Sequence, residues 1–303
     1  MPRPVSSSMA QFSGPTSAGG KPRGLPELPE TETIARDLHA MVVGSVVRDV
    51  SVPRPDVLRE IAAADLCSAL SGGRITRVWR RAKLIVLDLT LADRQNSHLV
   101  VQPRFTGGLL VDDGTLPTSE FAYSCVAMSL GDGRTLHYRD VRRLGTVALM
   151  PEARFLEYSS GLGPEPLDQT FDATAFSGCV RLSHQSIKVV LMDQRRLAGV
   201  GNIYANEALW RAGIDPSREA SSLTFAEAER LHTALRDVLT ASIAARGTSF
   251  RDYRDARGER GTFVEQLAAY GRGGEPCPRC GRRLVVTHAV DGRSTVFCPG
   301  CQF

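Results

Sequence analysis

Four cysteines in the last thirty residues constrain the fold most strongly, because they form two closely spaced pairs. The pairs are Cys277-x2-Cys280 and Cys298-x2-Cys301, with seventeen residues between them. This spacing is typical of one zinc ion held by four thiolates on two short turns. Such an ion has no free coordination position, so we expect one structural Zn²⁺ and no catalytic metal. The alternative is a pair of disulfides in a secreted domain, but no apolar signal segment supports it.

The residues between the cysteine pairs are expected to form a β-hairpin. Arg283–Thr287 and Ser294–Phe297 are strand-like, and Asp291-Gly292 is typical of a two-residue turn between strands. A hairpin of this size cannot fold alone, so the metal would supply its stability.

Basic residues are concentrated in three clusters, although the formal net charge of the chain is only +4. Neutralising phosphates releases counterions, so three such clusters suit a polyanion partner, whereas any one of them alone would be read as a solvated surface. No apolar run approaches the length of a membrane span, and no membrane partner is expected. The clusters lie within Arg74–Lys83, Arg134–Arg143 and Arg272–Arg293.

The first half of the chain is expected to form a β-sandwich domain over residues 26–155, led by a helix over residues 27–42. The helix has an apolar stripe at helical spacing, and short strands with Gly-rich turns follow it. Short strands of this kind favour a sandwich. The strand candidates are Val46–Val52, Arg74–Arg80, Lys83–Thr90, His98–Val101, Ala122–Leu130, Thr135–Arg139 and Val147–Met150.

The second half is expected to be helical. The pattern breaks around Gly161–Pro166, which places a linker at residues 156–170 and a helical domain at residues 171–262. Its clearest helix, Thr224–Ala245, begins with the capping box Thr-Phe-Ala-Glu. Residues 263–303 carry the zinc hairpin, so the predicted class is α+β.

Residues 1–25 are interpreted as a disordered leader or a misassigned start. Residues 1–24 are rich in Pro, Ser and Gly and contain no acidic residue, a composition typical of disorder. Leu25 directly precedes Pro26, and some leucine codons initiate translation in bacteria. Two other interpretations stay open: a targeting segment that is cleaved, and a leader that persists in the mature protein.

The segment Pro26–Glu32 reads like the first residues of an enzyme. A proline at the amino terminus has a free secondary amine, which can attack a sugar carbon and form an iminium ion. Inside a chain the same nitrogen is an inert amide. The structural interpretation is that Pro26 only opens a helix, with Glu27, Glu30 and Glu32 favourable near its positive end.

A second candidate site is the glycine turn Gly199-Val200-Gly201-Asn202, which precedes the helical segment Ile203–Trp210. A turn that opens a helix presents unpaired N–H groups, and the Asn202 amide adds a donor, so the turn could hold a phosphate. Alone the pattern is weak, since most such turns merely reverse the chain.

Taken together, these segments resemble the Fpg/Nei family of DNA glycosylases, and within it the formamidopyrimidine-DNA glycosylase branch. The resemblance runs from Pro26 to Gln302 in the order of that family. It rests on the Pro-Glu-Leu-Pro-Glu start, the helix-two-turns-helix segment Ala198–Ala205, Tyr270-Gly271-Arg272, and the zinc hairpin ending in Cys-Pro-Gly-Cys-Gln.

The resemblance implies four catalytic residues. Pro26 would attack C1′ of the damaged nucleotide, and Glu27 would protonate the sugar as its ring opens. The resulting iminium ion acidifies the C2′ proton, which couples base excision to strand cleavage by β- and then δ-elimination. Lys83 matches a hairpin lysine that contacts phosphates and assists elimination, although without the resemblance it would be read as a solvent-facing lysine. Arg293 matches the arginine that grips phosphates and donates a proton in δ-elimination.

The same resemblance implies a set of DNA contacts. Asn202 matches a phosphate-binding asparagine, Lys188 a lysine on the lesion side, and Arg142 the arginine that reads the unpaired partner base. The loop Thr248–Tyr253, with Tyr253 at its end, is expected to cover the lesion.

The wedge residues depart from the family pattern. Extruding a base leaves a gap that protein side chains fill. Phe105 stands where the family has methionine, and Leu144 replaces the aromatic wedge. A flat ring at Phe105 can stack where methionine does, so we expect base extrusion to survive and the partner-base preference to stay open.

The sequence therefore predicts a monomeric bifunctional glycosylase and abasic-site lyase in the bacterial cytoplasm, acting on oxidised purines in double-stranded DNA. Two alternatives remain: a lesion-binding protein without catalysis if the leader is retained, and an endonuclease VIII-like enzyme for oxidised pyrimidines. The latter usually has glycine where Leu28 stands.

Overall fold

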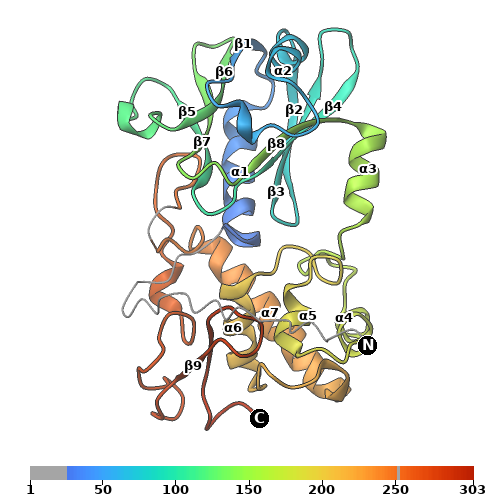
Figure 1. Ribbon diagram of the computed structural model, residues 1–303, viewed down its shortest axis with the longest axis vertical. Coiled ribbons are helices and arrows are strands. Elements are labelled where there is room, and N and C mark those ends of the chain that lie inside the picture. The colour runs from blue at the N-terminus through green and yellow to red at the C-terminus, as the bar shows by residue number, and fades with distance from the viewer. Residues whose placement is uncertain (1–25, 251–252) are drawn as a thin grey trace, which may run out of the picture.

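The computed structural model describes residues 26–250 and 253–303, so the expected leader, residues 1–25, lies outside it. Figure 1 shows a sheet-rich upper body from the first half of the chain and a helix-rich lower body from the second half. The predicted α+β class is confirmed, with a leading helix, a β-sandwich, a helical domain and a cysteine hairpin. The domain boundaries themselves stay predictions.

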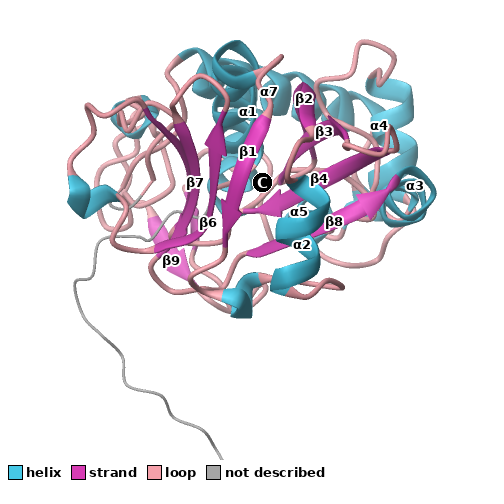
Figure 2. Cartoon of the chain, turned by 90° about the horizontal axis from the view of Figure 1, so that it is seen from above, coloured by secondary structure: helices cyan, strands magenta, loops and turns pink. Residues whose placement is uncertain are grey.

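The sandwich consists of two antiparallel four-stranded sheets, which Figure 2 shows from above. One sheet has the order β1-β6-β7-β5 and the other β2-β3-β4-β8. Apolar side chains of both sheets and of α1 fill the space between them. The strands are β1 (Val47–Ser51), β2 (Arg74–Arg81), β3 (Leu84–Thr90), β4 (Asn96–Gln102), β5 (Gly107–Asp112), β6 (Ser124–Leu130), β7 (Thr135–Asp140) and β8 (Thr146–Pro151).

Seven strands of the sandwich were expected, and the structure adds β5. This strand begins with Gly107-Gly108, and glycine at a strand start predicts a turn. Gly107 is nevertheless required there, because a Cβ would lie 2.9 Å from the Pro103 Cα. Two short helices, α2 (Ala63–Leu70) and α3 (Glu152–Ser160), were also missed. Two turns of helix are too short for a periodic pattern to stand out.

Helix α1 (Leu28–Val42) belongs to both bodies. Ile34, Leu38 and Val42 lie in the core of the sandwich, whereas Leu28 lies in the core of the helical domain. The first turn of α1 is therefore fixed where the two bodies meet.

The helical domain has the predicted long helix, α7 (Phe225–Ala244), with its capping box. Thr224 Oγ1 accepts from the Glu227 backbone N–H at 3.2 Å, and the Glu227 carboxylate accepts from the Thr224 N–H at 2.8 Å. No helix in the described part of the chain combines the length and apolar character needed to cross a bilayer. The other helices are α4 (Ala173–Arg181), α5 (Ile187–Met192) and α6 (Asn202–Ala212), with 3₁₀ turns at Pro55–Val57, Thr118–Glu120, Ala220–Ser222 and Phe263–Gln266.

The cysteine hairpin pairs β9 (Val285–Thr287) with β10 (Thr295–Phe297). The predicted two-residue turn at Asp291-Gly292 is wrong, because residues 288–294 form a longer loop between the strands. The Asp291 carboxylate shapes that loop by accepting from the Arg293 backbone N–H at 3.0 Å and from Lys188 at 3.2 Å.

Candidate active site

The first turn of α1 is docked onto the glycine turn that precedes α6. The Leu28 backbone N–H donates to the Gly199 carbonyl at 3.0 Å, and the Glu27 N–H donates to the Glu30 carboxylate at 2.9 Å. Gly199 has φ +80° and lies so close to Leu28 that a Cβ would be 2.8 Å from its side chain. Glycine is therefore needed for both the backbone conformation and the close approach.

Glu27 is 2% exposed and lies at the contact between the two bodies. One carboxyl oxygen accepts from the Ile203 N–H at 3.0 Å, and the other has no hydrogen-bond partner in the described structure. Burial raises the pKa of Glu27 to about 7, with Glu30 raising it further and the Lys83 ammonium and backbone N–H groups opposing the shift. A carboxyl group with this pKa can donate a proton at neutral pH.

Glu30 is bound more completely than Glu27. Its carboxylate accepts from the Tyr204 hydroxyl at 2.5 Å and from the Thr248 N–H at 2.7 Å, as well as from Glu27. Burial raises its pKa, and these donors oppose the shift. These donors come from the residue before α1, from α6 and from the segment after α7. Glu30 therefore fixes the first turn of α1 relative to the helical domain.

Lys83 lies in the turn between β2 and β3 and is half-buried. Loss of hydration lowers its pKa; the nearby Glu27 and Glu30 carboxylates raise it, and the Arg293 guanidinium lowers it further. Lys83 is therefore close enough to Glu27, Glu30 and Arg293 for their charges to act on it. A lysine with a lowered pKa can be neutral part of the time and accept a proton.

One carboxylate from the second half of the chain holds the turn that carries Lys83. Glu165 accepts from Arg80 at 2.5 Å, from Arg81 at 2.8 Å and from the Ala82 backbone N–H at 2.7 Å. Ala82 has φ +52°, a conformation that needs such support. Sequence analysis missed Glu165, because nothing in its local pattern reveals partners more than eighty residues away.

Arg293, in the loop of the cysteine hairpin, is exposed, and Asn202, the first residue of α6, is half-buried. The Asn202 amide donates to the Ser294 carbonyl at 3.0 Å, so in this structure it supports the loop. Lys188 contacts the same loop, and its predicted role as a DNA contact stays a prediction. Its side chain is fully buried, and its ammonium donates to Thr295 at 2.7 Å and to Asp291. In this structure the ammonium therefore supports the loop that carries Arg293.

Tyr253, at the end of the expected lesion-covering loop, is buried, and its predicted DNA contact stays a prediction. Residues 251–252 of the lesion-covering loop lie outside the described residues, and Tyr253 itself is 6% exposed. Its hydroxyl donates to the Glu30 carbonyl at 3.4 Å. The described end of this loop is therefore packed against α1 and offers DNA little surface.

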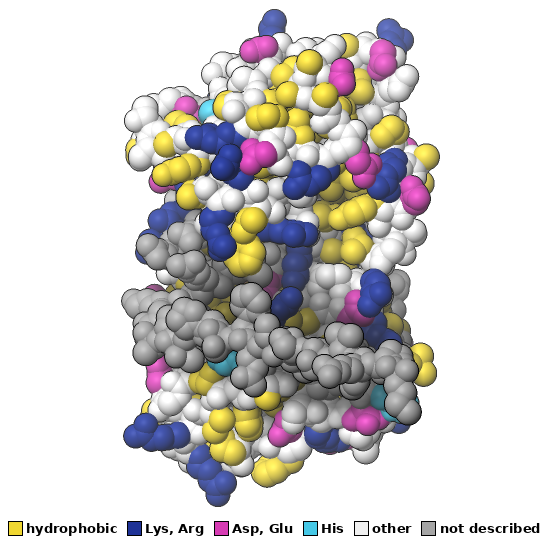
Figure 3. Space-filling view, viewed as in Figure 1, with side chains coloured by type: hydrophobic (Ala, Val, Ile, Leu, Met, Phe, Trp, Pro, Cys, Tyr) yellow, Lys and Arg dark blue, Asp and Glu magenta, His cyan; other side chains and the backbone are white. Residues whose placement is uncertain are grey.

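The expected wedge residues are exposed together on the sandwich domain. Arg142 and Leu144 lie on the surface, Leu144 with 40% exposure, and Phe105 is half-buried beside them. In Figure 3, Lys and Arg side chains gather across the middle of the visible face, along the lower edge of the upper body. A positive band at this junction suits a phosphate backbone.

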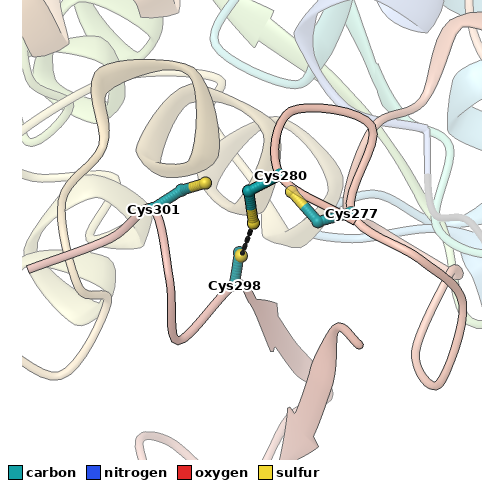
Figure 4. A group of neighbouring side chains, drawn as sticks. All are labelled: Cys277, Cys280, Cys298 and Cys301. Carbon is teal, nitrogen blue, oxygen red and sulfur yellow. Dashed lines mark hydrogen bonds between the residues drawn. The ribbon is translucent and has the colours of Figure 1, made fainter. Parts of the chain in front are cut away.

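Four thiols converge at the end of the chain, as Figure 4 shows. Their sulfur atoms all lie within 4.8 Å of one another, and thiolates about 2.3 Å from a tetrahedral zinc ion are about 3.8 Å apart. Burial acts to raise the pKa of Cys277, but backbone N–H donors at Arg279 and Cys280 help to lower it to about 6. The pKa of Cys298 is raised chiefly by burial and that of Cys301 chiefly by its contact with Cys280, so at these positions the bound zinc ion itself would stabilise the thiolate. The residues that fit one structural zinc ion are Cys277, Cys280, Cys298 and Cys301.

Glu207 is a further buried acid that sequence analysis missed. Its carboxylate accepts from three successive backbone N–H groups, at Ala268, Ala269 and Tyr270, over 2.7–2.9 Å. The contact joins α6 to the turn that leads into the cysteine hairpin. Glu207 therefore fixes the direction in which the hairpin leaves the helical domain.

The fold and site define a two-domain protein with a zinc hairpin, in which reactive groups from distant segments meet between the domains. Three family models match it: the formamidopyrimidine-DNA glycosylase N-terminal domain over residues 25–147, the H2TH domain of the same enzyme over residues 162–254, and a zinc finger found in FPG and IleRS over residues 274–302.

Relatives and solved structures agree with these matches. A formamidopyrimidine-DNA glycosylase of Heliobacterium modesticaldum is 41% identical over 92% of this chain and 100% of its own length. The Lactococcus lactis Fpg (MutM) in complex with a DNA containing N7-benzyl-Fapy-dG has a TM-score of 0.82 and 32% identity, covering 91% of this chain and 99% of that one. The Thermus thermophilus MutM (Fpg) has a TM-score of 0.79 and 39% identity, covering 91% and 98%. This chain belongs to the formamidopyrimidine-DNA glycosylase family.

Proposed function

We propose that the protein is a bifunctional DNA glycosylase and abasic-site lyase that removes oxidised purines from duplex DNA through the amine of Pro26. The observation that carries the proposal is the Glu27 carboxyl group. It is buried next to Pro26, has a pKa raised to about 7 and lies within the electrostatic reach of Lys83, which in turn lies within that of Arg293. A proton donor, a proton acceptor and a fixed cation around one nucleophile are what excision coupled to elimination requires.

The first stage of the proposed reaction forms a covalent intermediate. The Pro26 nitrogen attacks C1′, the damaged base leaves with the electrons of the glycosidic bond, and Glu27 protonates the sugar oxygen as the ring opens. The chain is active in this scheme only when Pro26 is its first residue, because an amide nitrogen has no available lone pair.

The second stage cleaves the strand. The iminium ion on Pro26 makes the C2′ proton acidic, and Lys83 can accept that proton because desolvation favours its neutral form. β-Elimination then releases the 3′ phosphate, and Arg293 donates the proton for δ-elimination at the 5′ side.

The DNA would lie across the positive band between the two bodies, with Phe105, Arg142 and Leu144 entering the gap left by the extruded base. Asn202 and Lys188 would support phosphate binding by holding the loop that carries Arg293. We propose that the protein does this as a monomer in the cytoplasm, on the DNA of the nucleoid.

Borohydride trapping tests the proposal. We expect a chain that starts at Pro26, made with an initiating methionine that is removed before proline, to form a reduced covalent adduct with duplexes containing 8-oxoguanine or an abasic site. The full 303-residue chain, if unprocessed, should bind the same duplexes without forming the adduct. A chain that starts at Pro26, contains zinc and never forms an adduct would contradict the proposal and favour a lesion sensor.

The lesion range is tested in the same assay. A Lactococcus lactis Fpg has been solved with a DNA containing an oxidised pyrimidine, so a duplex with an oxidised pyrimidine belongs among the substrates. We expect slower trapping on it than on 8-oxoguanine. Faster trapping would favour the endonuclease VIII-like alternative.

A further inference from the structure

One buried carboxylate joins the two loops that carry the wedge residues. Asp140, at the end of β7, is fully buried. One of its oxygens accepts from the Thr106 hydroxyl at 2.5 Å and from the Arg142 N–H at 3.1 Å, and the other accepts from the Gly145 N–H at 2.8 Å. Thr106 in turn accepts from the Arg142 N–H at 3.0 Å. The loops at residues 103–106 and 141–145 are thus tied to one anchor.

The backbone of both loops is held in an unusual conformation. Phe105 has φ +48° and Arg143 has φ +53°, in the left-handed region that favours glycine. Residues other than glycine keep such a backbone conformation only where surrounding contacts impose it. They are often found at binding sites. The bonds of Asp140 hold the chain neighbours of both residues, Thr106 and Arg142, and so restrict the direction of the Phe105 side chain in the DNA-free protein.

The ring of Phe105 is the partner of the Arg142 guanidinium. The guanidinium carbon lies 4.6 Å from the ring centroid, within the range of a cation–π contact. Among the described residues, no hydrogen bond or ion pair engages the guanidinium itself. Its donors are therefore free, and the Phe105 ring is the contact that positions the guanidinium.

We propose that Phe105 is a specificity-determining residue, which acts by stacking on Arg142 so that ring and guanidinium enter the duplex as one preorganised wedge. The proposal rests on the proposed function for the identity of the substrate. Cytosine presents two adjacent acceptors on its pairing edge, whereas adenine presents one acceptor beside a donor. Arg142 can only donate, so a guanidinium held in one plane favours cytosine over adenine opposite the lesion.

Binding to an uncleavable abasic-site analogue opposite C or A tests this inference, because binding needs no chemistry. We expect the full-length zinc-loaded chain to bind more tightly opposite C. Phe105→Met removes the ring but keeps an apolar side chain, and should reduce the C-over-A ratio of affinities by about two- to fivefold, the size of an exposed cation–π contact. Phe105→Tyr keeps the ring and should preserve the ratio.

Leu144→Met is the matched control, because Leu144 is an exposed wedge residue in the neighbouring loop without a ring contact to Arg142. It should change the affinity for both duplexes equally. The inference is overturned if the wild type does not discriminate between C and A, or if Phe105→Met weakens both duplexes by the same factor. Failure of the proposed function would appear separately, as absent borohydride adducts with the C-over-A binding ratio intact.

Discussion

Gly201→Ala tests whether base excision depends on the position of the Glu27 carboxyl group. A Cβ at Gly201 would lie 2.3 Å from Glu27 Cδ and 2.5–2.6 Å from its two oxygens. The backbone there, at φ −133° and ψ −161°, suits any residue, so the only effect is the clash. Ordinary contact is 3.4–4 Å, and the carboxyl group must therefore move by about 1 Å or more.

Two magnitudes follow from this displacement. Overpacking a buried site costs about 1–3 kcal/mol, and each kcal/mol lowers the melting temperature of a domain of this size by about 2–4 °C. A catalytic group misplaced by about 1 Å can slow the reaction about 100-fold. We therefore expect a folded variant with a modest loss of stability and a large loss of base excision.

Single-turnover excision of 8-oxoguanine by the chain that starts at Pro26, measured with thermal unfolding and zinc content, separates the two effects. Gly178→Ala is the control, since a Cβ there meets nothing within 4 Å and glycine lies inside α4. It should be stabilised by about 0.5–1 kcal/mol with unchanged excision. If Gly201→Ala folds and excises at the wild-type rate, Glu27 does not act as the acid from this position.

Three further predictions concern the charges of Glu27 and Lys83 and the support of the turn that carries Lys83. Glu27 has a pKa raised to about 7 from its ordinary value of 4.5, so the folded state binds the extra proton and its stability falls as pH rises between these values. This difference corresponds to about 3 kcal/mol. The stability of Glu27→Gln relative to the wild type should therefore increase from pH 5 to pH 8. A difference in denaturation midpoint between the two proteins that is the same at both pH values would refute the raised pKa. Lys83→Ala should slow strand nicking more than base excision. It also removes a cation that favours the Glu27 carboxylate, so the alkaline limb of the pH profile of excision should move to higher pH. Equal loss of both activities would mean that Lys83 has no role in elimination. Glu165→Gln should destabilise the chain by about 1.5–3 kcal/mol and reduce nicking more than excision. The control Glu157→Gln, which changes an exposed pair with Arg154, should have neither effect. If Glu165→Gln leaves the ratio of nicking to excision unchanged, Glu165 does not position Lys83.

Local patterns in the sequence predicted those features whose cause lies within a few residues. The cysteine spacing identified the zinc site, and the capping box at Thr224 located the start of α7. Most strands of the sandwich were predicted as well, because short strand-like runs between glycine-containing turns are visible in the sequence. The strand β5 was missed where glycines that allow close packing resemble a turn.

The interactions that position the site could not be predicted, because they join distant segments. Asp140 binds Thr106, Glu165 binds Arg81, and Lys188 binds Thr295 more than a hundred residues away. Asp140, Glu165 and Lys188 are charged, and a charged residue is expected to be exposed unless its partner is known. The resemblance predicted Lys188 as a DNA contact, which stays a prediction; its buried bonds to the loop that carries Arg293 could not be predicted from the sequence.

The proposed mechanism depends on the secondary amine of Pro26 as the nucleophile. Peptide mapping by mass spectrometry after borohydride reduction, on the chain that starts at Pro26 and an abasic-site duplex, tests it most directly. The account predicts that the sugar remnant is found on the Pro26 nitrogen. A remnant on the Lys83 side chain would contradict it.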